Sequence, residues 1–149
     1  MWNPGLLRRW FPYAGRLLAR GKLPVRIREI CILRVAVGQL SDYEWSQHVP
    51  IGLAAGLSEA EIQALAGGEE VEWSPLDASV IAAVDQLRTA GRIADDTWAV
   101  LRANFDEPQL VELPLLVGAY TGLAYFLNSL QVQVEPGLSG LPDSAHAQP

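Results

Sequence analysis

The chain has 149 residues, half of them hydrophobic, which is enough for one buried core and too few for two well-formed domains. Its net charge of −6 disfavours nucleic acid as a partner. The single cysteine excludes an internal disulfide, a CxxC redox pair and a cysteine-based zinc site. One free thiol fits a reducing compartment, so we expect a cytoplasmic protein.

The positive charges are concentrated at the start of the chain. Only Arg88, Arg92 and Arg102 of the eleven basic residues follow Arg34, and no acidic residue precedes Glu29. We therefore interpret residues 1–22 as a basic amphipathic arm whose apolar side chains contact a nonpolar surface. A mitochondrial targeting peptide is the alternative, because this segment is rich in arginine and lacks acidic residues.

Helical spacing of apolar residues, with clear start and stop signals, runs through the rest of the chain. The predicted helices cover residues 25–37, 41–56, 58–66, 74–90, 95–105 and 107–130. We therefore predict an all-α fold of about six to eight helices, with residues 23–134 forming the domain. Residues 135–149 are rich in turn-forming and small residues, which predicts a flexible tail.

Capping residues mark where several of these helices begin. Ser58 and Glu61 have the spacing of a capping box, and Ser74 precedes a proline at the first helical position. Asp95 and Asp106 are expected to cap the last two helices. Either Ser41 or Asp42 can cap the helix that carries the histidine.

The last predicted helix is the most apolar stretch, but polar residues interrupt it, so we expect a buried helix and no membrane span. Its small residues Gly118, Ala119, Gly122 and Ala124 allow another helix to approach closely. We predict a homo-oligomer, a trimer or a hexamer, in which part of the apolar surface is buried between subunits. A monomer with an ordinary packed core is the alternative.

Residues 29–48 hold the only cysteine and a dense group of ionisable side chains. Glu44 and His48 are four residues apart, so on a helix they share a face, and a carboxylate there can hold the imidazole and raise its basicity. Ser41 lies one further turn back on the same stripe. A purely structural ion pair is the alternative interpretation.

The segment LPVRIREICILRVAVGQLSDYEWSQHVPIGLAAGLSEAEIQAL resembles the carboxymuconolactone decarboxylase family, an all-helical group that includes AhpD-like alkylhydroperoxidases. The resemblance continues through WSPLDASVIAAVDQL, IADDTWAVL and LVELPLLVGAYTGLAYFLNSLQVQVEPGL, and covers roughly residues 22 to 138. It implies a helical bundle, while the reaction differs among members of the family.

The redox branch of this family has a glutamate on one helix and a CxxCxxxH motif on the next. Counted back from His48, the two cysteine positions fall on Ser41 and Glu44, and Glu29 takes the place of the glutamate. Because a thiolate must attack the peroxide and a second thiol must resolve the product, we do not expect a dithiol peroxidase. Cys31 lies in an apolar run and is expected to be an inert core residue; peroxide reduction through it alone is a remote alternative.

The decarboxylase members also lack the dithiol, which implies a lyase or isomerase that acts on a small cyclic carboxylic acid or lactone by general acid/base catalysis. We assign His48 as proton donor or shuttle, Glu44 as its orienting partner and Glu29 as a second carboxylate. No cofactor and no metal are expected; a metal site built from these three residues is the weaker alternative. A non-catalytic helical oligomer or binding module is the alternative to an enzyme.

Four further residues are candidates for binding the small-molecule substrate. Arg34 offers two parallel donors to a substrate carboxylate, or alternatively forms a structural salt bridge to Glu29 or another buried acid. Ser41 and Tyr43 belong to the same stretch as His48, and Tyr120 on the last helix is expected to close the pocket. Aromatic residues at helical spacing also serve simply as core.

Overall fold

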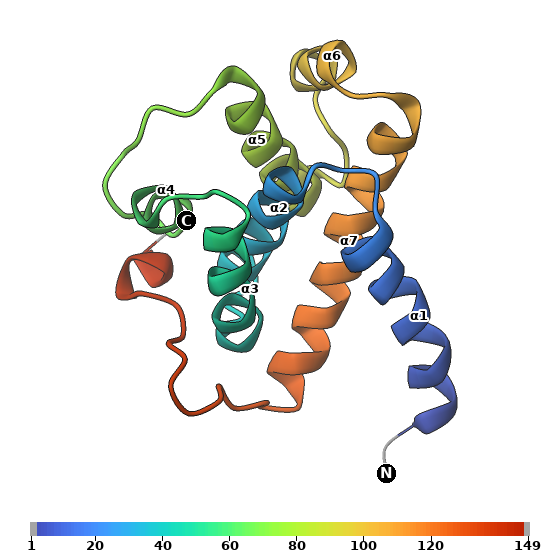
Figure 1. Cartoon of the computed structure of the whole chain (residues 1–149), viewed down its shortest axis with the longest axis vertical. Coiled ribbons are helices and arrows are strands. Elements are labelled where there is room, and N and C mark those ends of the chain that lie inside the picture. The colour runs from blue at the N-terminus through green and yellow to red at the C-terminus, as the bar shows by residue number, and fades with distance from the viewer. Residues whose placement is uncertain (1–2, 148–149) are drawn as a thin grey trace.

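A computed structural model describes residues 3–147, which form seven α-helices and one short 3-10 helix (Figure 1). The fold is all-α, as the sequence predicts. The helices are α1 (Pro4–Arg20), α2 (Val25–Gly38), α3 (Asp42–Ala54), α4 (Glu59–Leu65), α5 (Pro75–Ala90), α6 (Asp95–Asn104) and α7 (Glu107–Ser129), followed by η1 (Asp143–Ala147).

Helix α2 lies at the centre of the molecule and packs against α3, α5 and α7 (Figure 1). Its run Ile30, Cys31, Ile32 and Leu33 has no exposed surface. A helix whose middle turn is fully buried is stable only when other helices cover it, which explains why α3, α5 and α7 are arranged around α2.

Most of the predicted caps are present. Ser58 and Glu61 form a capping box at the start of α4, and the Ser74 side chain accepts a hydrogen bond from the Asp77 backbone. Asp106 caps α7. The Asp95 prediction was wrong, because Ala94 is the N-cap residue and Asp95 is the first helical residue of α6.

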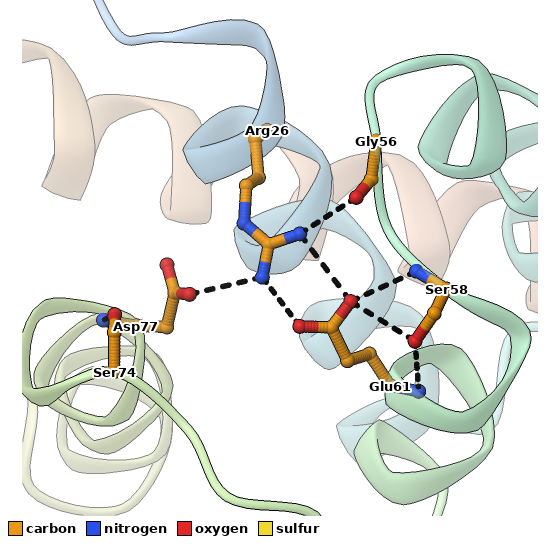
Figure 2. Close-up of polar contacts among 6 residues, drawn as sticks. All are labelled: Arg26, Gly56, Ser58, Glu61, Ser74 and Asp77. Carbon is orange, nitrogen blue, oxygen red and sulfur yellow. Dashed lines mark hydrogen bonds and ion pairs between the residues drawn. The ribbon is translucent and has the colours of Figure 1, made fainter.

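Arg26 joins three helices near the start of α2 (Figure 2). Its guanidinium donates to Glu61 of α4 at 2.6 Å, to Asp77 of α5 at 3.0 Å and to the Gly56 carbonyl at 2.9 Å. This hydrogen bonding lowers the pKa of Glu61 to about 2. The network therefore fixes the positions of α4 and α5 relative to α2.

Residues 4–20 of the predicted arm form a complete helix, α1, which lies along α7 (Figure 1). The described part of the predicted tail runs back over α3, because the Asp42 side chain accepts a hydrogen bond from the Leu141 backbone at 2.8 Å. In η1, Ala145 is buried against the core. Both ends of the domain therefore add to its packing.

Helix α7 is long and apolar enough to cross a membrane by length and composition alone, with 33% of that apolar window buried inside the protein. It packs against α1, α2, α3 and α5. These contacts leave α7 partly exposed, so it is less buried than the sequence predicts.

Candidate active site

A cavity of about 500 Å³ lies between α1, α3 and α7, and the segment after α7 also contributes to its wall. Its lining residues are Trp10, Phe11, Ala14, Gly15, Leu18, Tyr43, Glu44, Gln47, His48, Ala119, Tyr120, Leu123, Phe126, Leu127 and Val132. The wall is mostly carbon, and its ionisable groups lie on α3 and α7. A cavity of this size and composition is typical of a small-molecule site.

His48 is held in place by Glu29. The imidazole Nδ1 lies 2.7 Å from Glu29 Oε2, and both side chains are buried. Glu29 is not part of the cavity wall, and because Nδ1 is engaged by Glu29, Nε2 is the ring nitrogen left for a ligand. With Glu29 as a carboxylate, Nδ1 is the donor and Nε2 is free to take up or release a proton.

Arg28 supports this pair from the neighbouring position on α2. Its Nε donates to the second oxygen of Glu29 at 2.7 Å, and Nη1 donates to the Leu18 carbonyl. Leu18 belongs to α1 and also lines the cavity. A chain of hydrogen bonds therefore runs from α1 through Arg28 and Glu29 to His48.

The carboxylate that contacts His48 is Glu29, whereas the sequence predicts Glu44 for this role. Glu44 was expected to orient His48, but neither of its oxygens has a hydrogen-bond partner among the described residues. Glu29 comes from the adjacent helix and has the better approach to Nδ1. The four-residue spacing shows that Glu44 and His48 share a face of α3. It cannot show that a carboxylate from another helix lies closer to the His48 ring.

Glu44 is 2% exposed, lines the cavity and has no hydrogen-bond partner within residues 3–147. Burial raises the pKa of Glu44 to about 9, because the charged carboxylate loses its hydration in this environment. The side chain is therefore a neutral carboxylic acid at pH 7. The cavity wall thus carries a neutral acid, Glu44, as well as His48, whose carboxylate partner is Glu29.

Tyr120 packs against His48 in an edge-to-face arrangement, with ring centroids 5.2 Å apart. Burial, and then the negative charge of Glu29, raise the pKa of Tyr120 well above its usual range, so its hydroxyl remains a hydrogen-bond donor. Tyr43 also lines the cavity, but its hydroxyl donates to Glu135 at 3.0 Å. Tyr120 is the tyrosine better placed to contact a ligand.

Arg34 and Ser41 do not line this cavity. The Arg34 guanidinium forms two hydrogen bonds of 2.8 Å with Asp85 of α5 and a third with the Leu65 carbonyl. This salt bridge agrees with the structural alternative for Arg34, and its acidic partner is Asp85. Ser41 is fully buried at the start of α3, and its hydroxyl neither caps the helix nor has another partner among the described residues.

Cys31 is fully buried in α2 and does not line the cavity. Burial, and then the charge of Glu29, raise the pKa of the Cys31 thiol to about 12. A thiol in this state is a poor nucleophile, as its apolar surroundings in the sequence indicate. Within residues 3–147, no group of three or more histidine, cysteine, aspartate or glutamate side chains is arranged to hold a metal ion.

The α1 side of the cavity was not recognised as part of a site from the sequence. Trp10, Phe11 and Leu18 form much of the apolar wall, and Gly15 leaves space beside it. The amphipathic pattern of residues 1–22 predicts an apolar contact, but it cannot say that this contact encloses a cavity. Arg28 also has no distinguishing signal in the sequence besides its position next to Glu29.

Comparison with known proteins places the site in a family context. The family model described as the carboxymuconolactone decarboxylase family matches residues 4–96. A crystal structure of an Agrobacterium tumefaciens protein of unknown function, with a suggested role as the antioxidant defence protein AhpD, has a TM-score of 0.77. The two chains are 19% identical, and the match covers 89% of this chain and 92% of the other. Among curated proteins, none matches this chain.

Proposed function

This chain belongs to the carboxymuconolactone decarboxylase family, and we propose that it is a lyase or isomerase that moves a proton at a carbon next to a carbonyl group. The substrate class is a small lactone or cyclic carboxylic acid. The observation that supports this most is the His48–Glu29 pair, whose Nδ1 contact leaves Nε2 for the ligand at the wall of an apolar cavity. The proposed chemistry uses protein side chains alone.

In an isomerisation, His48 Nε2 removes a proton from the carbon next to the carbonyl. The electron pair of the C–H bond becomes the C=C bond of an enolate, and the negative charge collects on the carbonyl oxygen. The imidazolium then returns the proton to another carbon of the same conjugated system. In a decarboxylation, the electron pair of the broken C–CO2 bond forms the enolate, and protonated His48 supplies the proton.

Each neighbouring side chain has a distinct part in this scheme. Glu29 stabilises the imidazolium that forms on His48, because a carboxylate at 2.7 Å favours the charged ring. The Tyr120 hydroxyl donates a hydrogen bond to the developing enolate oxygen. Glu44, neutral at pH 7, leaves Glu29 as the one ionised carboxylate in contact with His48.

A peroxidase of the dithiol type is not proposed. Ser41 and Glu44 occupy the positions at which the redox branch carries its two cysteines, and the thiol of Cys31 is shielded from the cavity. A binding module without catalysis is the second candidate, since an apolar cavity suits ligand binding as well as turnover. Turnover that depends on His48 distinguishes the two.

The test is a screen of enolisable lactones and cyclic carboxylic acids with wild-type protein and two matched variants. His48→Gln keeps a polar side chain without a titratable nitrogen, and His146→Gln changes the other histidine, which lies exposed in η1. We expect His48→Gln to lower turnover by roughly 100- to 10,000-fold and His146→Gln to leave it unchanged. Equal turnover by all three proteins contradicts the proposal.

A further inference from the structure

A second hollow of about 180 Å³ adjoins the cavity at His48. The two hollows share Trp10, Phe11, Leu123 and Phe126 as lining residues. The second hollow is completed by Leu6, Leu7 and Gly122, so its lining side chains are apolar throughout. We call these two adjoining hollows between α1 and α7 the apolar channel.

The polar groups of the apolar channel lie at one end. His48, Glu44 and Tyr120 belong to the first hollow only. Tyr43 and Gln47, the other polar lining residues, both donate hydrogen bonds to Glu135. Neither lysine nor arginine lines either hollow within the described part of the chain.

Two glycines keep the channel wide. A Cβ atom built on Gly15 of α1 or on Gly122 of α7 meets no other atom within 4 Å. Gly15 lines the first hollow and Gly122 the second. A larger residue at either position takes up space that is open in the structure.

We propose that the apolar channel binds a lactone that carries an unbranched alkyl tail, with the ring at His48 and Tyr120 and the tail between α1 and α7. This inference rests on the proposed function and narrows its substrate class from cyclic acids and lactones to tailed lactones. A carboxylate head lacks a lysine or arginine partner here, and burying an unpaired charge is costly. An alkyl tail gains free energy in proportion to the apolar area that it buries against these side chains.

The narrower substrate class also selects the reaction. A lactone without a carboxylate cannot lose CO2, so the proton transfer is a shift of a C=C bond within the ring. His48 Nε2 takes the proton from the carbon next to the carbonyl and returns it at the far end of the dienolate. All atoms of the substrate stay in the product.

The test measures binding of three saturated probes by titration calorimetry. The probes are γ-decalactone with a hexyl tail, γ-valerolactone with a methyl tail, and the ring-opened hydroxydecanoate that has the carbon skeleton of γ-decalactone. We expect γ-decalactone to bind at least about 30-fold more tightly than γ-valerolactone, since each buried methylene contributes up to about fourfold. Hydroxydecanoate should bind at least about 10-fold more weakly than γ-decalactone. Equal affinity within either pair overturns the proposal.

Two neighbouring residues of α7 provide a matched pair of variants. Phe126 lines both hollows, whereas Tyr125 lines neither, and they are 42% and 59% exposed. Phe126→Ser should weaken binding of γ-decalactone by at least about fivefold with little effect on γ-valerolactone, and Tyr125→Ser should change neither. If Phe126→Ser instead alters the oligomeric state and leaves lactone affinity unchanged, a second copy of the chain occupies the channel and the proposal is overturned.

Saturated lactones bind without reacting, which separates this inference from the proposed function. Loss of the tail dependence in wild-type protein overturns the substrate class, whatever the catalytic result. Tail-dependent binding that persists while no unsaturated lactone is turned over contradicts the proton transfer and leaves a binding site for tailed lactones.

Discussion

His48 and Glu44 lie one helical turn apart on α3, yet their surroundings give them opposite properties. His48 has a carboxylate partner, Glu29, at 2.7 Å. Glu44 has no partner among residues 3–147, so its charged form is disfavoured. The different surroundings of the two side chains make His48 the candidate for proton transfer and keep Glu44 a neutral neighbour.

Glu44 predicts a specific dependence of stability on pH. Its pKa rises from the usual value of 4.5 to about 9 on folding, so the folded state binds the proton more tightly than the unfolded state. The sign follows from linkage: this contribution to stability is fully present below about pH 4.5 and is lost as pH rises toward 9. The steepest expected loss is about 1.4 kcal/mol per pH unit.

Glu44→Gln removes this titration. Urea unfolding at pH 5, 6, 7 and 8 should show the stability of Glu44→Gln rising relative to wild type as the pH increases. Glu59→Gln, an exposed change at the start of α4, is the control and should follow wild type. Parallel pH curves for wild type and Glu44→Gln show that Glu44 is ionised in the folded protein.

At the scale of elements, α1 determines the size of the cavity. It packs along α7, and the Leu18 carbonyl accepts a hydrogen bond from Arg28, the residue that also holds Glu29. Most of the apolar wall on one side of the cavity belongs to α1. Residues that fill the space beside α1 should therefore affect ligand binding without disturbing the helices behind it.

Gly15→Leu tests this role of α1. Leucine is favoured over glycine in a helix interior by roughly 0.8–1 kcal/mol, and a Cβ at Gly15 meets nothing within 4 Å, so stability should be equal or higher. The leucine side chain occupies the cavity and should weaken γ-decalactone binding by about 10-fold or more. Gly118→Leu on α7, which also has open space and does not line the apolar channel, should bind normally. Normal binding by Gly15→Leu contradicts the assigned cavity.

The hydrogen bonds of Arg26 predict that the contacts joining α2, α4 and α5 weaken in acid. The pKa of Glu61 is lowered to about 2, chiefly by its hydrogen bond from Arg26, so this stabilisation is present above about pH 4.5 and is lost as pH falls toward 2. These side chains are partly exposed, so after screening we expect roughly 1–2 kcal/mol.

Arg26→Met should therefore lower stability at pH 7 and lose less further stability than wild type between pH 5 and pH 2.5. Denaturant unfolding across this range measures the difference. Arg92→Met removes an exposed ion pair with Asp95 and serves as the control, with little effect at any pH. Equal acid sensitivity of wild type and Arg26→Met shows that the network does not control acid unfolding.

At the scale of the whole molecule, large apolar side chains remain exposed on α7 and α1. Val111 is 61% exposed and Leu115 49%, and they are four residues apart on one face of α7. On α1, Tyr13 is 43% exposed and lines the same hollow as these two residues. Such a surface favours association with other copies of the chain.

Sedimentation analysis should therefore give a mass of three or six times the chain mass of 16.2 kDa. Leu115→Lys places a charge on this face and should reduce the mass toward that of one chain, while Leu40→Lys, an exposed change at the other side of α2, should not. A wild-type protein that sediments as a monomer at all concentrations contradicts the predicted oligomer.

The sequence predicts the helices well because their caps and apolar spacing are local features. The site is less predictable, since it depends on which side chains meet across helices. Spacing places Glu44 on the His48 face of α3, whereas the partner in the structure is Glu29 of α2. The salt-bridge partner of Arg34 is likewise on another helix: it is Asp85 of α5, which no sequence motif marks.

The central claim, that His48 moves a proton at a carbon next to a carbonyl, is tested most directly by hydrogen exchange in the substrate. Wild-type protein and His48→Gln are incubated in D2O with an unsaturated γ-alkyl lactone, and deuterium at the ring carbons is followed by NMR. Wild type should incorporate deuterium at least about 100-fold faster than His48→Gln. Equal rates for the two proteins, or no exchange above the uncatalysed rate with either, contradict the claim.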